Sequence, residues 1–533
     1  MLWQKEKGSN LYSDLFENMI RPTQLVRLKR NKSNADSLTA RLIGNEKFKE
    51  GDFRGAMDKY NQSICLAENG SEYLSIAYGN RSSCFEKLEK YNFCLVDIQL
   101  AKDNNYPLRL MQKLDNRKAK CLLQIQSTDT ILVQPQSILS YPAAENLPCM
   151  ANVLRIDRND DYGRLILATQ DIHIGDTVIV EEDYVRFVVG ENIRCSNCGK
   201  RYVNFVPCEK CGGAMFCGER CLKNSFHQME CEMLFYLDIC NSGNFFPVFV
   251  LRSIIIGISA FSSVAEMMKF VENCKVGDPN EIPISTSSHA SRYRAFFKLS
   301  AFIPDQLSDQ YKEFSTMAYS VYHSITSSAL AAQFQTVAQR RFLMHLAIHH
   351  SFILRTNSFG SFETSTISGI TNADNDYEQS LLLVTSYLNH ACCPNVAKLK
   401  MDNLSICKAI LPIKKGEQLF ISYVDEDNDK YNSLIDRQRY LQDAFGFTCK
   451  CEICEKGTMR NTFTLQDDSA FINVVNGLKT LENHFSISTV SDVIENCKRF
   501  LIRFPKMVLS PESVYVKHNL VAMMQLELDY QAE

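Results

Sequence analysis

The chain has 533 residues, which is enough for about three to four domains at roughly 150 residues each. Hydrophobic residues make up 45% and charged residues 22%, as in a globular protein with sizeable cores, and the net charge of −3 offers no field for binding nucleic acid or an anionic membrane. The longest apolar stretch, residues 245–261, is interrupted by Arg252, so we expect a buried core helix rather than a membrane span. The 21 cysteines bunch at metal-ligand spacings in a long chain, which favours a reducing compartment over a secreted disulfide scaffold.

The N-terminal part of the chain has a helical pattern after a polar start. Residues 1–36 are polar and mixed, and we expect a flexible N-terminus there. Residues 37–130 predict a helical domain, in which the segments 43–64 and 80–101 share one rhythm of small and large residues. Residues 110–123 predict a further helix.

The two segments resemble tetratricopeptide helix pairs, whose repeat is about 34 residues. Tyr60 and Ile98 occupy matching places in them, and Gly44 and Ala56 would allow two helices to approach closely. An unrelated helical bundle is the alternative interpretation of this pattern.

A change of periodicity follows the helical part. Residues 125–150 are rich in proline and predict a linker. The runs 165–169, 176–182 and 184–189 are rich in β-branched and apolar residues and are separated by turn signals. They predict short strands over residues 150–194.

Eight potential zinc ligands crowd into the next segment, residues 195–231. They form four pairs with two-residue or three-residue spacers: Cys195 and Cys198, Cys208 and Cys211, Cys217 and Cys221, His227 and Cys231. Zinc takes four sulfur or nitrogen ligands in a tetrahedron, and one turn with such a spacer supplies two of them. The cluster therefore predicts two closed, structural zinc sites, and the spacing permits either sequential or interleaved pairing.

The remaining chain alternates helical and short-strand patterns. We expect helices over residues 232–355, short strands over 356–425 and helices again over 468–533. His349 and His350 lie on a strongly apolar helix without another ligand pair nearby, so we assign them to packing rather than to metal binding.

Three short motifs lie in this second half of the chain. They are NHACCPN at residues 389–395, GEQLFISY at 416–423 and CKCEIC at 449–454. The third motif offers three thiolates, whereas a closed zinc site needs four. Cys392 or Cys393 is the natural candidate for the fourth ligand, which would clip the third motif onto the first.

Together and in this order, the three motifs resemble the signature of SET-domain lysine methyltransferases. The eight-ligand cluster resembles a MYND zinc finger, and a MYND finger inserted into a SET domain is typical of the SMYD family. The segment from Gly163 to Ala168, followed by Ile174-Gly175-Asp176, is similar to the opening segment of that family. The resemblance covers about residues 150–455.

The resemblance implies an α+β fold class. We expect a short-strand SET β-fold that is interrupted by a MYND zinc finger and flanked by N-terminal and C-terminal α-helical, tetratricopeptide-like regions. The implied division of the second half is a first SET part (150–194), the finger (195–231), a helical insertion (232–355), the SET core (356–425), a post-SET zinc segment (440–456) and a C-terminal helical region (468–533).

The resemblance also implies roles for individual residues. Tyr423 matches the catalytic tyrosine, and Phe445 and Phe447 match aromatic positions that wall the lysine channel. The residues expected to line the S-adenosylmethionine site are Gly163, Arg164, Asn357, Ser386, Asn389 and His390, together with Tyr423, Phe445 and Phe447. The implied zinc sets are Cys195, Cys198, Cys217 and Cys221; Cys208, Cys211, His227 and Cys231; and Cys392, Cys449, Cys451 and Cys454.

Three positions depart from the family pattern. Ala391 stands where the family usually has a small polar residue, Gln418 replaces the usual Glu, and the opening loop has the single Gly163 where many relatives have two. We do not expect Ala391 or Gln418 to transfer a proton, so the chemistry implied by the resemblance tolerates both.

The implied function is an S-adenosylmethionine-dependent protein-lysine N-methyltransferase that acts on histone or non-histone proteins, with three structural zinc ions. The alternative is a non-catalytic adaptor, in which the MYND finger and the helical repeats bind partner peptides. Direct nucleic-acid binding is not expected, because residues 195–231 contain few basic residues and no evident recognition helix. We further expect a monomer, no membrane association, and a location in cytoplasm and nucleus.

Overall fold

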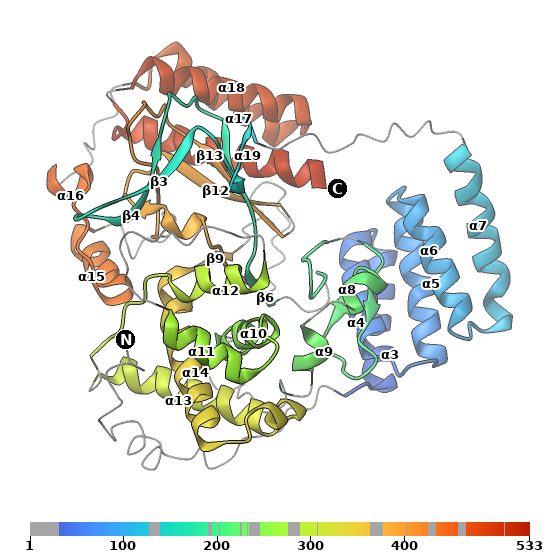
Figure 1. The fold of residues 1–533 in the computed structure, drawn as a ribbon. Helices are drawn as coiled ribbons and strands as arrows, with labels where there is room; N and C mark the ends of the chain where they lie inside the picture. The colour runs from blue at the N-terminus through green and yellow to red at the C-terminus, as the bar shows by residue number, and fades with distance from the viewer. Residues whose placement is uncertain are drawn as a thin grey trace.

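The structure is a computed structural model of the full chain, shown in Figure 1. It describes residues 31–126, 139–189, 194–201, 203–223, 226–231, 233, 246–274, 288–305, 308–362, 377–401, 403–424, 433–456, 465–505 and 507–532. Most of the predicted flexible N-terminus, residues 1–36, lies outside these ranges.

The N-terminal helices form one layered unit, drawn in blue in Figure 1. They are α3 (Asn34–Lys49), α4 (Phe53–Leu66), α5 (Glu72–Lys87), α6 (Tyr91–Asp103) and α7 (Met111–Gln126). The side chains of Ser33, Asp52 and Ser71 cap the first three helices by accepting a hydrogen bond from a backbone N–H of the first turn. Because Ser33 caps α3, the first helix begins inside the segment that we expected to be flexible.

A glycine allows the first two helices to approach closely, as the sequence predicts. A Cβ atom on Gly44 would lie 2.7 Å from the Tyr60 ring and 3.2 Å from the carbonyl oxygen of Ala56, closer than real Cβ contacts. The close approach of α3 and α4 at Gly44 and Ala56 is therefore confirmed.

The central sheet has five strands in the order β1-β2-β5-β13-β12. The strands are β1 (Ala143–Ala144), β2 (Leu147–Ala151), β5 (Thr177–Glu182), β13 (Leu404–Ala409) and β12 (Val396–Met401). Strand β5 from the first part of the chain pairs antiparallel with β13 from the second part, with Val180 opposite Ile406. Two segments that are separated by the finger and a helical insertion therefore share one sheet.

The sheet begins earlier than predicted, because β1 and all of β2 except Ala151 lie inside the proposed linker 125–150. Pro148 lies within β2, but β2 pairs with β5 only through Met150 and Ile179, and its register with β1 does not use Pro148. A proline without an N–H is tolerated where no ladder hydrogen bond is needed.

Smaller sheets complete the β part. The hairpin of β3 (Leu154–Asn159) and β4 (Gly163–Ala168) precedes β5, and a three-stranded sheet joins β6 (Val185–Val189), β10 (Tyr377–Leu381) and β9 (Ser358–Phe362). The predicted runs at 165–169, 176–182 and 184–189 correspond to β4, β5 and β6, whereas β3 was not predicted.

The helical insertion packs below the sheet in Figure 1. It contains α10 (Phe246–Ser259), α11 (Val264–Asn273), α12 (His289–Phe297), α13 (Asp309–Thr326) and α14 (Val337–Asn357). Helix α10 is buried over almost its whole length, as expected for a core helix. In the described part of the chain no single helix has the length and apolar composition of a membrane span. Taken together, the bent pair of α10 and α11 has that length and composition, and nothing beyond length and composition points to a span.

The two adjacent histidines on α14 pack in this insertion. His350 is fully buried, with its two ring nitrogens 2.9 Å from Ser253 Oγ and 3.1 Å from Tyr293 Oη. The His349 ring lies against Phe297, with 4.5 Å between the ring centroids. The packing role assigned from the sequence is confirmed.

The C-terminal helices α17 (Ser469–Asn483), α18 (Ile487–Arg503) and α19 (Pro511–Ala532) cover one face of the sheet, in red in Figure 1. Their apolar side chains form one core with Leu399 of β12 and Ile406 of β13. The shorter helices α15 (Leu434–Phe445) and α16 (Glu452–Lys456) lie beside the sheet.

Candidate functional site

The ligands of the finger (residues 195–231) come together as two sets of four. One set is Cys195, Cys198, Cys217 and Cys221, the other is Cys208, Cys211, His227 and Cys231, and the ligand atoms of each set lie within 4.8 Å of one another. The strands β7 (Val206–Pro207) and β8 (Met215–Phe216) and the helices α8 (Glu219–Lys223) and α9 (His227–Glu230) hold them in place. The grouping is interleaved, as the resemblance implied.

The geometry of the finger fits zinc. With zinc–sulfur bonds of about 2.3 Å, two ligands of a tetrahedron are about 3.8 Å apart. The Sγ atoms of Cys198 and Cys217 are 3.5 Å apart, those of Cys208 and Cys231 are 3.9 Å apart, and Cys211 Sγ is 3.4 Å from His227 Nε2. Each set contains four protein ligands, so each site is closed and structural.

A third set of four thiols lies beside the short strand that carries the first motif. It consists of Cys392, Cys449, Cys451 and Cys454, and the Sγ atoms of Cys392 and Cys454 are 3.6 Å apart. The structure therefore selects Cys392, and not Cys393, as the fourth member. Since Cys392 belongs to the first motif, a zinc ion here would fasten the segment that follows α15 to that motif.

The first two motifs meet as neighbouring strands. Strand β11 (Asn389–His390) pairs in parallel with β14 (Phe420–Ile421), and the amide of Asn395 fixes the pair: its Nδ2 donates to Gln418 O at 2.9 Å, and its Oδ1 accepts from Phe420 N at 2.7 Å. Gln418 contributes its backbone carbonyl to this contact. The Gln-for-Glu departure therefore leaves the contact intact.

Tyr423 lies at the end of this paired segment. Its hydroxyl donates a hydrogen bond to Leu388 O at 2.7 Å, and its backbone N–H donates to His390 Nδ1 at 3.0 Å. Burial raises the pKa of the Tyr423 phenol well above its ordinary value, so the hydroxyl keeps its proton. The hydroxyl hydrogen is committed to Leu388, and the lone pairs of the oxygen stay available.

Aromatic rings surround Tyr423. The ring centroids of Phe445 and Phe447 lie 4.9 Å and 6.3 Å from that of Tyr423, and the His390 ring lies 5.4 Å from it. Phe445 ends α15, and Gly446 adopts the left-handed conformation with φ of 77°, so the chain turns sharply between the two phenylalanines. The partly exposed Phe445, Phe447 and Tyr423 form an aromatic wall that remains open to solvent.

A polar rim continues from this wall. Asn389 Nδ2 donates to Arg164 O at 2.9 Å, and the Arg164 guanidinium lies over the Tyr387 ring at 4.7 Å from its centroid. Arg164 also donates to Ser300 Oγ at 3.2 Å, and Asn357 Nδ2 donates to Ser300 O at 2.6 Å. Hydrogen bonds thus connect residues from four separate stretches of the chain.

Two further predicted residues lie at this rim. Ser386 Oγ donates to Leu382 O and lies 3.5 Å from Asn357 O. Gly163 has a positive φ of 67°, and no heavy atom lies within 4 Å of where a Cβ would be. The backbone is therefore left accessible at this position. Together with the contacts described above, the structure brings the predicted cofactor positions into one neighbourhood.

One residue of this neighbourhood was missed by the sequence reasoning. Glu181 of β5 is buried, and its carboxylate accepts four hydrogen bonds, from the backbone N–H groups of Leu383, Val384 and Thr385 and from the Thr385 hydroxyl, at 2.7 to 2.8 Å. Burial raises its pKa, while these four donors act in the opposite direction. Glu181 fixes the turn η4 (Thr385–Tyr387), which carries Ser386 and leads into Asn389. The sequence signal, a charged residue at a core-facing strand position, was present in TVIVEE.

Two buried arginines fasten the finger to the three-stranded sheet and to the insertion. Arg186 of β6 donates to Cys198 O at 2.9 Å and pairs with Glu378 of β10 at 3.0 Å. On the other side, Arg252 of α10 donates to Glu230, the residue before the zinc-set member Cys231. These contacts tie both zinc sets of the finger to the rest of the fold.

The finger also shares a core with the N-terminal helices. Apolar residues of α4, α5 and α6 form one buried cluster with residues of the finger, such as Phe205 and Phe216. The fully buried Arg81 pairs with Asp97 at 2.7 Å and donates to Phe205 O at 3.0 Å. Asn204 Nδ2 donates to Asp97 at 2.6 Å. One face of the finger is therefore occupied by the protein's own helices (Figure 1).

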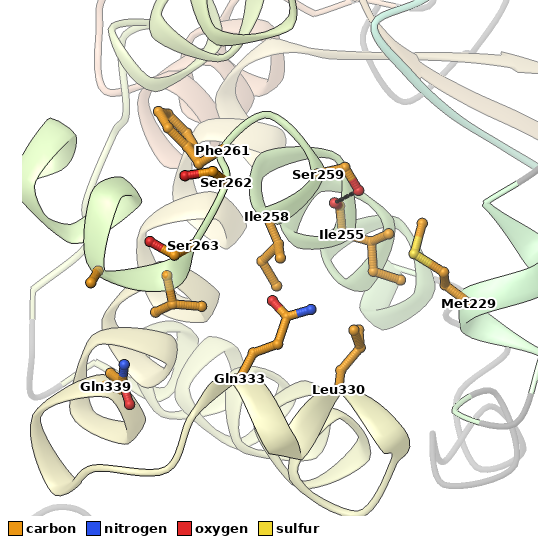
Figure 2. A pocket seen from close by; sticks show the side chains of 12 residues that line it. Met229, Ile255, Ile258, Ser259, Phe261, Ser262, Ser263, Leu330, Gln333 and Gln339 are labelled. Atoms are coloured by element: carbon orange, nitrogen blue, oxygen red, sulfur yellow. Dashed lines mark hydrogen bonds between the residues drawn. The ribbon is translucent and has the colours of Figure 1, made fainter.

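A separate cavity of about 470 Å³ lies between α10, α11 and η3 (Ala329–Gln333). Figure 2 shows Gln333 and Leu330 facing Ile258 and Ile255 across it, with Met229 at one side. None of its lining residues is titratable, and none belongs to the aromatic wall or the polar rim. The cavity offers serine hydroxyls but no titratable group to activate one as a nucleophile, so we take the neighbourhood of Tyr423 as the candidate active site.

Comparisons with known proteins agree with this assignment. The family described as "SET domain" matches residues 163–424. The chain is 23% identical to "Protein-lysine N-methyltransferase SMYD4" of Pongo abelii and 21% identical to that of Danio rerio, with 77% and 78% of this chain and 66% and 65% of the relatives covered. It is 22% identical to a "SET and MYND domain-containing protein" of Dictyostelium discoideum, with 57% of this chain and 82% of the relative covered. The chain thus spans just under two thirds of the length of the first two relatives.

A solved structure is also similar. "Crystal structure of the SET domain of LSMT bound to Lysine and AdoHcy" aligns with 71% of this chain and 86% of its own, at 12% identity and a TM-score of 0.26. At this TM-score the likeness carries no information about the site.

Proposed function

Because the chain belongs to the SMYD family, in which a MYND finger interrupts a SET domain, we propose that it is an S-adenosylmethionine-dependent protein-lysine N-methyltransferase. The observation that carries the proposal is the position of Tyr423. Its hydroxyl is fixed on Leu388 O at 2.7 Å, at the junction of the aromatic wall and the polar rim. The wall suits an alkyl amine, and the rim suits a polar cofactor.

The polar rim fits the cofactor by its chemistry. Gly163 leaves open space beside its backbone, and Asn389, Arg164, Asn357 and Ser386 present amide, guanidinium and hydroxyl groups around it. These groups suit the carboxylate, amine and ribose of an aminoacyl nucleoside. When bound, S-adenosylmethionine supplies an electrophilic methyl group on a sulfonium.

The aromatic wall prepares the amine. A free lysine has a pKa near 10.4, so reaching the neutral form at pH 7 costs about 4 to 5 kcal/mol. A substrate lysine packed against Phe445, Phe447 and Tyr423 would lose contact with water, which disfavours the ammonium and so reduces this cost. The walls also hold the amine in line with its target, which removes much of the remaining entropic barrier.

Tyr423 orients the amine. Because its hydrogen is donated to Leu388 O, its oxygen presents lone pairs that accept a hydrogen bond from a neutral amine. The lone pair of the amine nitrogen is then free to attack the methyl group. The bound proton of Tyr423 is retained, so the phenol acts by orientation and electrostatics rather than as a base.

The three zinc sets have structural roles in this proposal. All three contain four protein ligands, which leaves no open coordination position for substrate or water. The third set holds the segment with Phe445 and Phe447 against the motif of Asn389 and His390. Zinc at this set would therefore complete the aromatic wall.

Other parts of the proposal concern partners and location. We propose a protein substrate that inserts one lysine, a monomeric enzyme without direct nucleic-acid binding, and a location in the cytoplasm and nucleus. All cysteines that the structure describes are free of disulfides, which supports a reducing compartment. Peptide partners of the finger would bind away from the face that the N-terminal helices occupy.

The test uses zinc-loaded full-length protein. Calorimetric titration with S-adenosylmethionine measures binding, and transfer of a labelled methyl group to proteins of a cell extract measures activity. The same two measurements are made on Tyr423→Phe. Its control is Tyr530→Phe, since Tyr530 is exposed on α19, far along the chain from the site. Absence of cofactor binding would contradict the proposal; cofactor binding with no transfer to any protein would favour the adaptor function instead.

A further inference from the structure

Cys393, the cysteine left out of the third zinc set, faces a buried lysine. Lys517 of α19 is 8% exposed, and its Nζ lies 2.9 Å from Cys393 Sγ. The two residues come from distant parts of the chain: Cys393 from the NHACCPN motif and Lys517 from the C-terminal helical region. The contact joins that region to the loop of the candidate active site.

The environment of Lys517 is unusual for a lysine. Among the described residues the thiol of Cys393 is the recorded partner of its amine, and no carboxylate pairs with it. Its neighbours along α19, Val516 and Leu520, are fully buried in the core between the C-terminal helices and the sheet. The amine nitrogen is thus held in direct contact with the sulfur, inside an apolar surrounding.

Cys393 itself is a partly exposed residue. Its side chain packs against the same C-terminal core, and its Sγ lies 4.0 Å from Val508 O. A small oxidant such as a peroxide can therefore reach a sulfur atom that already touches an amine.

We propose that Cys393 and Lys517 form an oxidative modification site, at which peroxide produces a covalent sulfur–nitrogen bond between the two side chains. In the first step the sulfur of Cys393 attacks hydrogen peroxide: an S–O bond forms, the O–O bond breaks, sulfur loses two electrons, and peroxide is reduced to water. In the second step Lys517 Nζ attacks the sulfenic sulfur: an S–N bond forms, the S–O bond breaks, and the hydroxyl leaves with an amine proton as water. One peroxide is consumed and two waters are released, and a thiol reductant reverses the link.

The link would act on the active-site loop. Cys393 lies between His390, which contacts Tyr423, and Asn395, which fixes β14. A bond from Cys393 to α19 would hold this loop against the C-terminal helices. The modification would thus make the rigidity of the site depend on the oxidation state of the surroundings.

The experiment treats zinc-loaded full-length protein with hydrogen peroxide at stoichiometric concentrations and maps peptides by tandem mass spectrometry without reduction. The expected product is a cross-linked pair of peptides that contain Cys393 and Lys517, with the mass of the two peptides less two hydrogen atoms. Reduction with dithiothreitol returns the separate peptides. Zinc release is followed in the same samples by a chromogenic chelator, so that oxidation of zinc ligands is recognised.

Two variants and one internal control make the result specific. Lys517→Arg removes the primary amine and is expected to remove the link and leave a sulfenic acid that dimedone traps, and Cys393→Ala is expected to remove both. Cys149 is the internal control, because it is also a partly exposed cysteine and no described lysine contacts it. Should either variant fail to fold, dimedone added to the unaltered protein before peroxide must suppress the cross-link.

Three outcomes would overturn the proposal. One is that peroxide oxidises Cys393 to no greater extent than Cys149. Another is a stable sulfenic or sulfinic acid at Cys393 without any link to Lys517. The last is release of zinc before Cys393 reacts.

Discussion

The buried carboxylate of Glu181 is expected to control the geometry of the cofactor rim, and Glu181→Gln tests this. The carboxylate accepts four hydrogen bonds at 2.7 to 2.8 Å, two on each oxygen, from Leu383, Val384 and Thr385. Glutamine has the same shape, but one of its two terminal groups is an NH₂ donor. With the NH₂ toward Leu383 and Val384, two backbone N–H donors face another donor; turned the other way, only the Thr385 N–H does, because the Thr385 hydroxyl can accept instead.

The magnitude follows from the number of lost contacts. A hydrogen bond to a charged group contributes about 1.5 to 3 kcal/mol, so the better orientation, which loses one, costs about that much before other effects. Removing a buried charge returns part of this free energy. We expect a net loss of about 1 to 2 kcal/mol of unfolding free energy and a fall in S-adenosylmethionine affinity of about tenfold, because η4 carries Ser386 and leads into Asn389.

The assay is thermal unfolding together with calorimetric titration of the cofactor. The matched control is Glu182→Gln, the next residue along β5, whose exposed carboxylate accepts one hydrogen bond from Asn403 at 2.7 Å. An exposed position of this kind changes stability by about 0.5 kcal/mol or less. If Glu181→Gln unfolds and binds the cofactor like Glu182→Gln, the role assigned to Glu181 is refuted.

Three further predictions follow from other parts of the structure. Tyr423→Phe removes the fixed hydroxyl, so methyl transfer should fall about 10²-fold while calorimetry shows cofactor affinity within a few fold; an equal loss of both would argue against an orienting role. Chelation of zinc should free the N-terminal helices, because Arg81 and Asn204 bind across their interface with the finger; limited proteolysis that leaves residues 31–231 as resistant as in the zinc-loaded protein would contradict this. Burial lowers the pKa of His350 well below the 6.5 of an unfolded histidine, so the unfolded state takes up a proton that the folded state refuses, and stability should fall as pH drops below about 6.5. Denaturation with urea at several pH values should show a loss of up to about 1.4 kcal/mol per pH unit from His350, which His350→Gln removes; an unchanged slope in that variant would count against the assignment.

The zinc sets separate what the sequence predicts from what only the folded structure decides. The spacing within each pair is a local property, because one turn of chain supplies both ligands, and so the sequence indicated every member of the finger sets. The combination of pairs is not local. The interleaved arrangement and the choice of Cys392 over Cys393 depend on how β8, α9 and α16 pack, which is visible in the sulfur–sulfur distances.

The site shows the same division. Tyr423, Asn389 and His390 stand in short motifs whose order along the chain is distinctive, and the sequence therefore indicated them. Glu181 and Lys517 stand in stretches that look like an ordinary strand and an ordinary helix. Their importance comes from partners about two hundred and about one hundred residues away, respectively, as the hydrogen bonds to η4 and to Cys393 show.

The sequence by itself determined the type of most elements and the ligand pairs, and it indicated the candidate reacting groups, because periodicity and short spacings are properties of a chain segment and its nearest neighbours. The tertiary structure alone decided which segments share a sheet, which face of the finger is covered, and which charged side chains are buried. These depend on the closure of long loops: β5 pairs with β13 across the finger and the insertion, and Arg81 enters the core of a finger far along the chain. Only the packed structure shows whether such a buried charge has found its partner.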